Sequence, residues 1–471
     1  MKLTKNLDQN IKMLREYFGI DKTFDIVERE ILIGDTKCYM LMIDGLVQDE
    51  MLLNIINRMQ MFSSKDLKKK DFHTYFKKSI GYSQVEPSTD FNQLETMMLS
   101  GTIILFFDGI EEFLIIDARQ FPIRSPEEPE LEKVTRGPRD GFVETLMFNI
   151  ALIRRRVIDP KLRAEIKTVG SRSKTDLCIC YLDDKVDKEL LTNILNKIDA
   201  IDVEAIVMAE KTISELIMPR QWFNPLPQVR YTERPDVAAA HLFEGHLLVI
   251  TDTSPSVIIL PTTVWHFTQH AEDYYHVPVV GTYLRQLRMF AIVIAYIGMP
   301  LWYIFILYRN ELPDFLEIVR PDEIGDVPIF IQILALELGV DLLRISSIHT
   351  PASLSTSLGI VGGLVLGNYA IEAGWFSGQA ILVMAVVSIC TFAIPSNEFA
   401  MGIRMLSLFV LIATFLFGHI GFIVANIIVL LIVIMTRNGS NVKFTYPLIP
   451  FNFKHLMHVL FRFPLPPKKK N

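Results

Sequence analysis

The sequence has few cysteines and none of the short motifs by which many enzymes are recognised. Its 471 residues include four cysteines without metal-ligand spacing, so we predict no metal site and buried, reduced thiols. No Walker-type glycine loop, GxGxxG, HExxH or GxSxG pattern occurs, which leaves no signal for nucleotide, zinc or serine-hydrolase chemistry. The N-terminus also lacks the apolar core and cleavage site of a signal peptide. We therefore expect a protein that is not an enzyme, that needs no cofactor, and whose N-terminal part stays in the cytosol.

Charge is scarce in the C-terminal part of the chain. Residues 287–471 contain 12 Lys/Arg and 10 Asp/Glu, whereas residues 1–286 contain 35 and 43. The first part is thus net acidic, which does not suit non-specific nucleic-acid binding, because that binding needs clustered basic residues facing phosphates. We predict a charged soluble domain followed by a hydrophobic membrane domain, with no nucleic-acid partner.

Two stretches of the first part, 101–109 and 245–253, share the pattern Gly, any residue, four apolar residues, any residue, Asp. A helical stretch precedes each and a second apolar run follows each, which predicts a β-hairpin. Between them, 175–182 is typical of a strand and 188–201 of an amphipathic helix. The expected fold is an α/β cytosolic N-terminal part of two related subdomains, followed by an all-α polytopic membrane domain.

The expected boundaries follow from these patterns. Residues 1–95 are predicted to be a mainly helical region, and residues 96–286 to hold the two hairpin-containing subdomains. The membrane domain is placed at 287–436 with about six helical segments, and a basic cytosolic tail at 437–471.

The segment 135–156 is unusually rich in arginine. Its arginines are Arg136, Arg139, Arg154, Arg155 and Arg156. Gly137 as N-cap and Pro138 in the first turn, with arginines at the far end, are typical of a well-capped helix. Glu127 and Glu128 lie just upstream. We expect the arginines to form ion pairs with carboxylates, some across a subunit boundary, and a phosphate site is the alternative.

Several runs of the second part are long and apolar. Three have about the length of one membrane span: 289–308, 357–374 and 376–395. The run 401–435 is too long for one span, so a turn near 418–421 would make it two. Within 357–374, Gly359, Gly363 and Gly367 repeat at four-residue spacing, which favours close helix packing.

These runs give five spans, whereas a cytosolic N-terminal domain and a basic cytosolic tail require an even number. The sixth candidate, 327–345, contains Glu337, Asp341 and Arg344 on one helical face. Each ionised group facing lipid costs at least ~2.5–3.5 kcal/mol, so this face must meet protein, water or partner charges. We take the three residues as candidates to line or gate a pore. The alternative is an amphipathic helix on or re-entering the membrane, with 401–435 as one bent span.

Four stretches carry a resemblance to a known family. They are "QLETMMLSGTIILFFDG", "PEEPELEKVTRGPRDGFVETLMFNIALIRRR", "YTERPDVAAAHLFEGHLLVITDTSPSVIILP" and "EDYYHVPVVGTYLRQLR". In order and spacing they resemble the A-subunit family of spore germinant receptors, over almost the whole chain. The stretch "PRQWFNPLPQVRYTERPD" is most similar to the stage V sporulation AF branch of that family.

The resemblance implies a multi-pass protein of the spore inner membrane, with both termini in the cytosol. It implies a homo-oligomer, a pentamer, that acts as an ion channel and promotes ion and dipicolinic-acid release during germination. The implied partners are other spore membrane germination proteins and the lipid bilayer. A secondary transporter is less favoured, because the membrane part shows no internal duplication. A non-conducting membrane scaffold or sensor subunit stays the alternative.

Overall fold

The computed structural model describes residues 3–61, 85–119, 132–308, 327–349, 371–439 and 442–463. It divides into two units, here called the α/β unit and the helical unit. The α/β unit comprises residues 1–220, 229–262 and 439–441. The helical unit comprises residues 221–228, 263–438 and 442–471.

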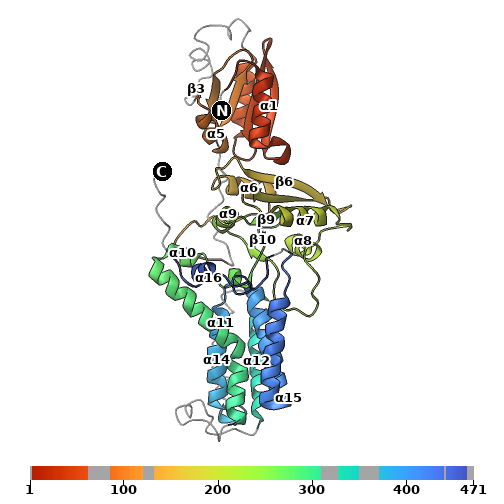
Figure 1. Ribbon diagram of the computed structural model, residues 1–471, viewed down its shortest axis with the longest axis vertical. Coiled ribbons are helices and arrows are strands. Elements are labelled where there is room, and N and C mark those ends of the chain that lie inside the picture. The colour runs from red at the N-terminus through yellow and green to blue at the C-terminus, as the bar shows by residue number, and fades with distance from the viewer. Residues whose placement is uncertain are drawn as a thin grey trace. The chain divides into compact units, whose positions relative to one another are not determined.

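The first half of the α/β unit is a five-stranded antiparallel sheet with helices on both faces (Figure 1). Its strands are β1 (Ile26–Ile33), β2 (Thr36–Ile43), β3 (Val85–Ser88), β4 (Ile103–Phe107) and β5 (Phe113–Ile116), in the order β1-β2-β4-β5-β3. Its helices are α1 (Leu7–Phe18), α2 (Asp49–Met59), α5 (Phe91–Leu99) and a 3-10 turn, Ile20–Lys22. Side chains alternate along the strands, so Tyr39 and Leu41 pack with α1 and α5 while Cys38 and Met40 pack with α2.

The second half repeats this plan with a second five-stranded sheet. Its strands are β6 (Leu162–Val169), β7 (Thr175–Leu182), β8 (Arg230–Thr232), β9 (Leu247–Thr251) and β10 (Val257–Leu260), in the order β6-β7-β9-β10-β8. Its helices are α6 (Leu146–Arg154), α7 (Lys188–Asp199), α8 (Ala209–Ile217) and α9 (Pro235–Phe243). The two sheets have the same strand order when counted from their own first strands, which confirms two related subdomains.

The hairpin predictions are confirmed. β4 pairs with β5 and β9 with β10, and the helices α5 and α9 lead into these hairpins. The predicted strand at 175–182 is β7, and the predicted amphipathic helix is α7, with Leu190, Leu191, Ile194 and Ile198 buried.

The expectation of a mainly helical region over residues 1–95 is wrong in part, because it contains β1, β2 and β3. β1 and β2 form a hairpin that turns at Gly34, whose φ of 60° favours glycine. β2 is buried at most positions, so it lacks the alternation that marks a half-exposed strand.

The helical unit is built around α11 (Pro278–Leu307), which contacts α12 (Ile329–His349), α14 (Gly378–Phe392), α15 (Asn397–Met435) and α16 (Phe453–Leu460). α10 (Glu272–Tyr275) precedes it, and a 3-10 turn, Val264–Phe267, lies before α10. Among the described residues, α11 and α15 are long and apolar enough to cross a membrane, and α14 is a shorter apolar helix. The expected basic tail contains α16, while Lys468 to Lys470 lie outside the described residues.

The turn expected near 418–421 is present. The backbone of α15 leaves the helical conformation at Gly418, with φ 61° and ψ −142°. Phe267 stacks on Phe399 near the start of α15 and contacts Phe444 beyond its end, with ring centroids 5.4 and 6.2 Å apart. The chain therefore doubles back at Gly418, and α15 consists of two halves packed side by side (Figure 1).

Candidate functional site

The charged residues of α12 meet an arginine of α15. Arg404, in the first half of α15, donates from Nε to Oε2 of Glu337 at 2.8 Å and from Nη2 to the Glu337 carbonyl at 2.7 Å. Its Nη1 lies 2.9 Å from Oδ1 of Asp341. The four-residue spacing of the two acids puts them on consecutive turns of α12, so one guanidinium reaches both. We call Glu337, Asp341 and Arg404 the polar cluster.

The two acids of the polar cluster differ in exposure. The Glu337 side chain is 8 % exposed, whereas the Asp341 side chain is 33 % exposed. When both acids are ionised, two negative charges share one positive charge. Glu337 is thus held inside the helix packing, and Asp341 is the acid that can meet water or a solute at the surface of the chain.

Arg344 has different neighbours, although it was expected on the same face as the acids. Its guanidinium donates to the side chain of Asn397 at 2.9 Å, at the start of α15, and lies 5.8 Å from the Phe392 ring centroid. The structure therefore places all three predicted residues next to α15, but only the two acids share a partner. Gly359, Gly363 and Gly367 lie outside the described residues.

Sequence reasoning missed Arg404. The signal was available, because it is the single Lys or Arg between positions 345 and 436. An isolated arginine in an apolar run is costly unless a charge pairs with it, and α12 carries the two acids that satisfy this requirement.

The arginine-rich segment differs from expectation at its start. The prediction of a helix beginning at Gly137 and Pro138 is wrong, because α6 begins at Leu146 with Thr145 as N-cap. The Asn149 side chain accepts from the Val143 N–H at 2.8 Å and donates to the Val143 carbonyl at 2.6 Å. These hydrogen bonds and their neighbours hold the preceding residues in irregular structure.

Arg154 and Arg156 pair with carboxylates of the same chain. Arg154 is fully buried and donates to both carboxylate oxygens of Asp25 at 2.6 and 3.0 Å, and to the Thr23 hydroxyl at 3.1 Å. Arg156 donates to Asp140 at 2.7 Å. Since Asp25 belongs to the first sheet subdomain and Arg154 to the second, this pair joins the two halves of the α/β unit.

The remaining arginines of the segment, Arg136, Arg139 and Arg155, are exposed. The acids proposed for them, Glu127 and Glu128, lie outside the described residues. A pairing of these residues across a subunit boundary therefore stays a prediction.

The cysteines are free, as expected, and Cys38, Cys178 and Cys180 are buried. Burial raises the pKa of the Cys180 thiol to about 12, so this thiol stays neutral and unreactive near pH 7. No group of three or more His, Cys, Asp or Glu able to hold a metal occurs among the described residues.

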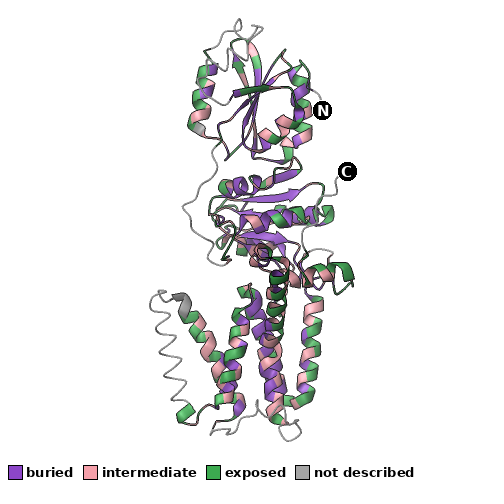
Figure 2. Ribbon diagram, turned by 90° about the vertical axis from the view of Figure 1, so that its left-hand side faces the viewer, coloured by how far each residue is buried: buried purple, intermediate pink, exposed green. Residues whose placement is uncertain are grey.

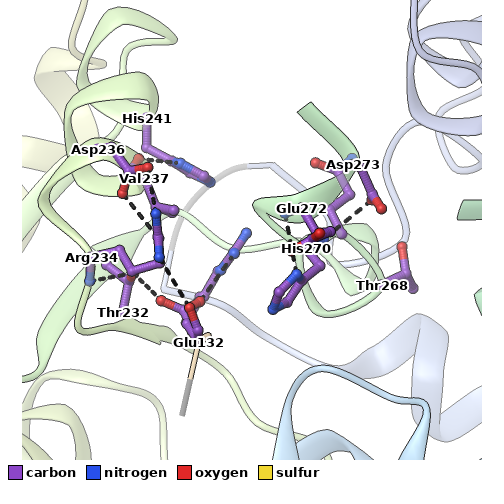
Figure 3. A network of polar contacts seen from close by, with 12 residues as sticks. Glu132, Thr232, Arg234, Asp236, Val237, His241, Thr268, His270, Glu272 and Asp273 are labelled. Carbon is purple, nitrogen blue, oxygen red and sulfur yellow. Dashed lines mark hydrogen bonds and ion pairs between the residues drawn. The ribbon is translucent and has the colours of Figure 1, made fainter. Parts of the chain in front are cut away.

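The α/β unit also contains a polar network that the sequence reasoning did not single out (Figure 3). The Glu132 carboxylate accepts from the Thr232 hydroxyl at 2.5 Å and lies 3.6 Å from Arg230. Arg234 is fully buried and pairs with Asp236 at 2.9 Å while donating to the Glu132 carbonyl at 3.2 Å. The signal was the charged string "ERPD" directly after a strand. These contacts hold the segment around Glu132 against β8 and α9. The charged groups of the network bind one another, which favours a structural role.

Comparisons with known proteins give matches over nearly the whole chain. The family model described as "Bacillus/Clostridium GerA spore germination protein" matches residues 12–471. The chain is 38% identical to "Stage V sporulation protein AF" of Bacillus subtilis (strain 168) over 462 residues, covering 98% of this chain and 93% of that protein. It is 29% identical to "Spore germination protein KA" of the same organism, covering 98% of this chain and 85% of that protein.

A solved structure is similar to the N-terminal part. It is the crystal structure of the N-terminal domain of the A subunit of the Bacillus megaterium spore germinant receptor GerK3, with a TM-score of 0.43 and 23% identity, covering 55% of this chain and 96% of that chain. The family match spans nearly the whole sequence, including both units. The chain belongs to the GerA family of spore germination proteins.

Proposed function

We propose that this chain acts in spore germination as an ion-conducting subunit of the spore inner membrane, and that the polar cluster is part of its ion path. The observation that carries the proposal is the polar cluster itself, in which two acids share one arginine inside a group of apolar helices. Asp341 is the part-exposed member and is assigned to line the path. Glu337 and Arg404 hold α12 and α15 in the arrangement that presents it.

A membrane location is supported by the outer surfaces of the helices. Large apolar side chains on α14 and α15 are exposed within the chain, among them Ile389, Leu416 and Phe417. Figure 2 shows exposed positions along the helices of the helical unit. Such surfaces are covered by lipid or by other protein. The two halves of α15 also enclose an apolar groove of about 450 Å³, lined by Phe409, Ile412, Leu416, Ile420 and Val424 among others.

An oligomer follows from the same reasoning. Asp341 lies at the surface of one chain, so a closed aqueous path lined by it requires further copies around an axis. The family resemblance implies a pentamer, with N- and C-termini in the cytosol and with other spore germination proteins as partners.

A non-conducting scaffold or sensor is the second candidate. It is favoured by the near-complete burial of Glu337, because a neutralised ion pair can serve helix packing alone.

The experiment that separates the two is ion release from germinating spores that carry Asp341→Asn in place of the native chain. We expect slower or altered release at an unchanged protein level, whereas Glu372→Gln, an exposed acid in the same unit, serves as the matched control and should leave release unchanged. Normal release from the Asp341→Asn spores supports the scaffold instead.

A further inference from the structure

A second cluster of charge lies in the helical unit, before the apolar part of α11. Its described residues include three arginines, Arg285, Arg288 and Arg462, and the carboxylate of Asp273. Arg288 occupies both oxygens of that carboxylate, with Nη1–Oδ2 at 2.9 Å and Nη2–Oδ1 at 3.0 Å. Figure 3 shows Asp273 with its neighbours His270 and Glu272. Arg285 is a weaker partner of the same carboxylate, because its Nε lies 3.7 Å from Oδ2, beyond hydrogen-bond distance. One carboxylate therefore serves two guanidinium groups.

The other two arginines have donor atoms without acceptors. Arg285 is fully buried and its Nη1 donates to the carbonyls of His458 and Val459, but Nε and Nη2 have no hydrogen-bond partner. Arg462 is half-buried, and its Nη2 donates to the Tyr274 carbonyl at 2.7 Å while the buried Nη1 has no partner. Leaving a buried, charged hydrogen-bond donor unsatisfied is costly, so we expect a bound group to supply hydrogen-bond acceptors to these atoms.

The two arginines that carry the unsatisfied donors lie beside the same aromatic ring. The guanidinium carbons of Arg285 and Arg462 lie 5.5 and 6.0 Å from the centroid of the same Tyr274 ring. Arg462 is fixed there because its backbone N–H donates to the Thr282 hydroxyl at 3.0 Å, one turn before Arg285 on α11. Three unfilled donor atoms on two cations match an anion with several acceptor oxygens, and phosphate is such an anion, with a geometry that fits the guanidinium fork.

The surroundings indicate where the phosphate comes from. The uncharged run of α11, residues 289–308, begins directly after Arg288. α16 and its flanks, which contact α11, expose Phe451, Phe453, Phe461 and Phe463. Aromatic side chains next to basic ones, at the end of an apolar helix, are typical of the membrane–water interface.

We propose that Arg285 and Arg462 bind the phosphate of an anionic phospholipid, with α16 lying on the bilayer surface beside the start of α11. The proposal rests on the membrane location argued above. It gives the basic C-terminal segment a lipid partner and makes the position of α16 dependent on the lipid composition of the membrane.

The test uses the full-length protein in detergent micelles titrated with phosphatidylglycerol or phosphatidylcholine, with bound lipid counted by native mass spectrometry. We expect the unmodified protein to retain phosphatidylglycerol in preference to phosphatidylcholine. Arg462→Gln should need roughly tenfold more phosphatidylglycerol, the loss expected for a charge-assisted hydrogen bond. Arg285→Lys, which keeps the charge but loses the fork, should be weakened in the same direction.

Arg437→Gln is the matched control, because Arg437 is an exposed arginine of the same unit outside the cluster. Unchanged retention in both cluster variants, or an equal loss in the control, overturns the proposal. A third arm adds inorganic phosphate alone, and displacement of phosphatidylglycerol by millimolar phosphate shows a site for the free anion instead. Ion conduction is read separately, so a non-conducting protein with intact lipid selectivity counts against the proposed function only.

Discussion

The ion pair between Asp25 and Arg154 is predicted to hold the two halves of the α/β unit together. Both side chains are almost completely buried, at 0 and 1 % exposure, and two hydrogen bonds join them. Asp25→Ala leaves the guanidinium with its hydrogen bond to the Thr23 hydroxyl but removes its ion pair, so an uncompensated charge stays buried. Removing one partner of a buried pair costs about 3–5 kcal/mol, and we expect a loss of this size in the α/β unit.

The assay must report on the α/β unit alone. All four tryptophans, Trp222, Trp265, Trp302 and Trp375, belong to the helical unit, so tryptophan fluorescence does not serve. Hydrogen exchange of the full-length protein serves instead, because it can be followed in peptides that cover β6 and β7. A loss of 3 kcal/mol speeds exchange there by roughly 100-fold, since every 1.4 kcal/mol is tenfold.

Arg156→Ala is the matched control for this experiment. Its pair with Asp140 is partly exposed and lies in the same segment, so its loss should cost only ~0.2–1 kcal/mol. The double variant Asp25→Leu with Arg154→Met should recover part of the loss, because no charge is then left unpaired. Exchange in the Asp25→Ala protein as slow as in the control refutes the role assigned to the pair.

Three further predictions concern single positions. Burial lowers the pKa of His246 from 6.5 to about 4. Between these pH values the unfolded chain binds a proton at this residue that the folded chain does not. The free energy of unfolding therefore falls by at most about 3 kcal/mol as the pH drops from 6.5 to 4. Hydrogen exchange of β9 across this pH range should show the slope, and His246→Leu should remove it. Gly421→Val should separate the halves of α15, since a Cβ there lies 2.0 Å from the Ala413 carbonyl oxygen, and a cysteine crosslink between the halves should then form poorly. Arg404→Leu should lower the amount of folded protein in membranes more than Arg344→Leu, as measured by protease resistance. The reason is that loss of Arg404 removes the ion-pair partner of both Glu337 and Asp341.

Local sequence signals predicted the parts of the fold that local interactions determine. The hairpins β4–β5 and β9–β10 were recognisable because Gly and Asp punctuate apolar runs, and the break in α15 because a 35-residue apolar run exceeds one span and contains glycine. β2 was missed because a strand buried at most positions lacks alternation, and β1 because three consecutive charged residues, 28–30, interrupt its apolar run.

The features that depend on distant contacts were not predictable in the same way. The start of α6 is set by Asn149 and by the hydrogen bond from the Phe142 N–H to the Glu233 carbonyl, 91 positions along the chain, and not by the local Gly-Pro signal. The acids of α12 were found from their helical spacing, but their partner Arg404 is 67 positions away from Glu337. The spacing of residues in the sequence identifies a charged helix face, whereas tertiary packing determines which residue forms an ion pair with it.

The central claim, that the chain conducts ions along a path lined by Asp341, is tested most directly by ion flux through the purified full-length protein in liposomes. The account predicts flux with the unmodified protein, a clear reduction with Asp341→Asn, and an unchanged rate with Glu372→Gln at equal protein incorporation. Liposomes that contain correctly inserted, oligomeric protein and yet pass no ions, or that pass them equally with Asp341→Asn, contradict it.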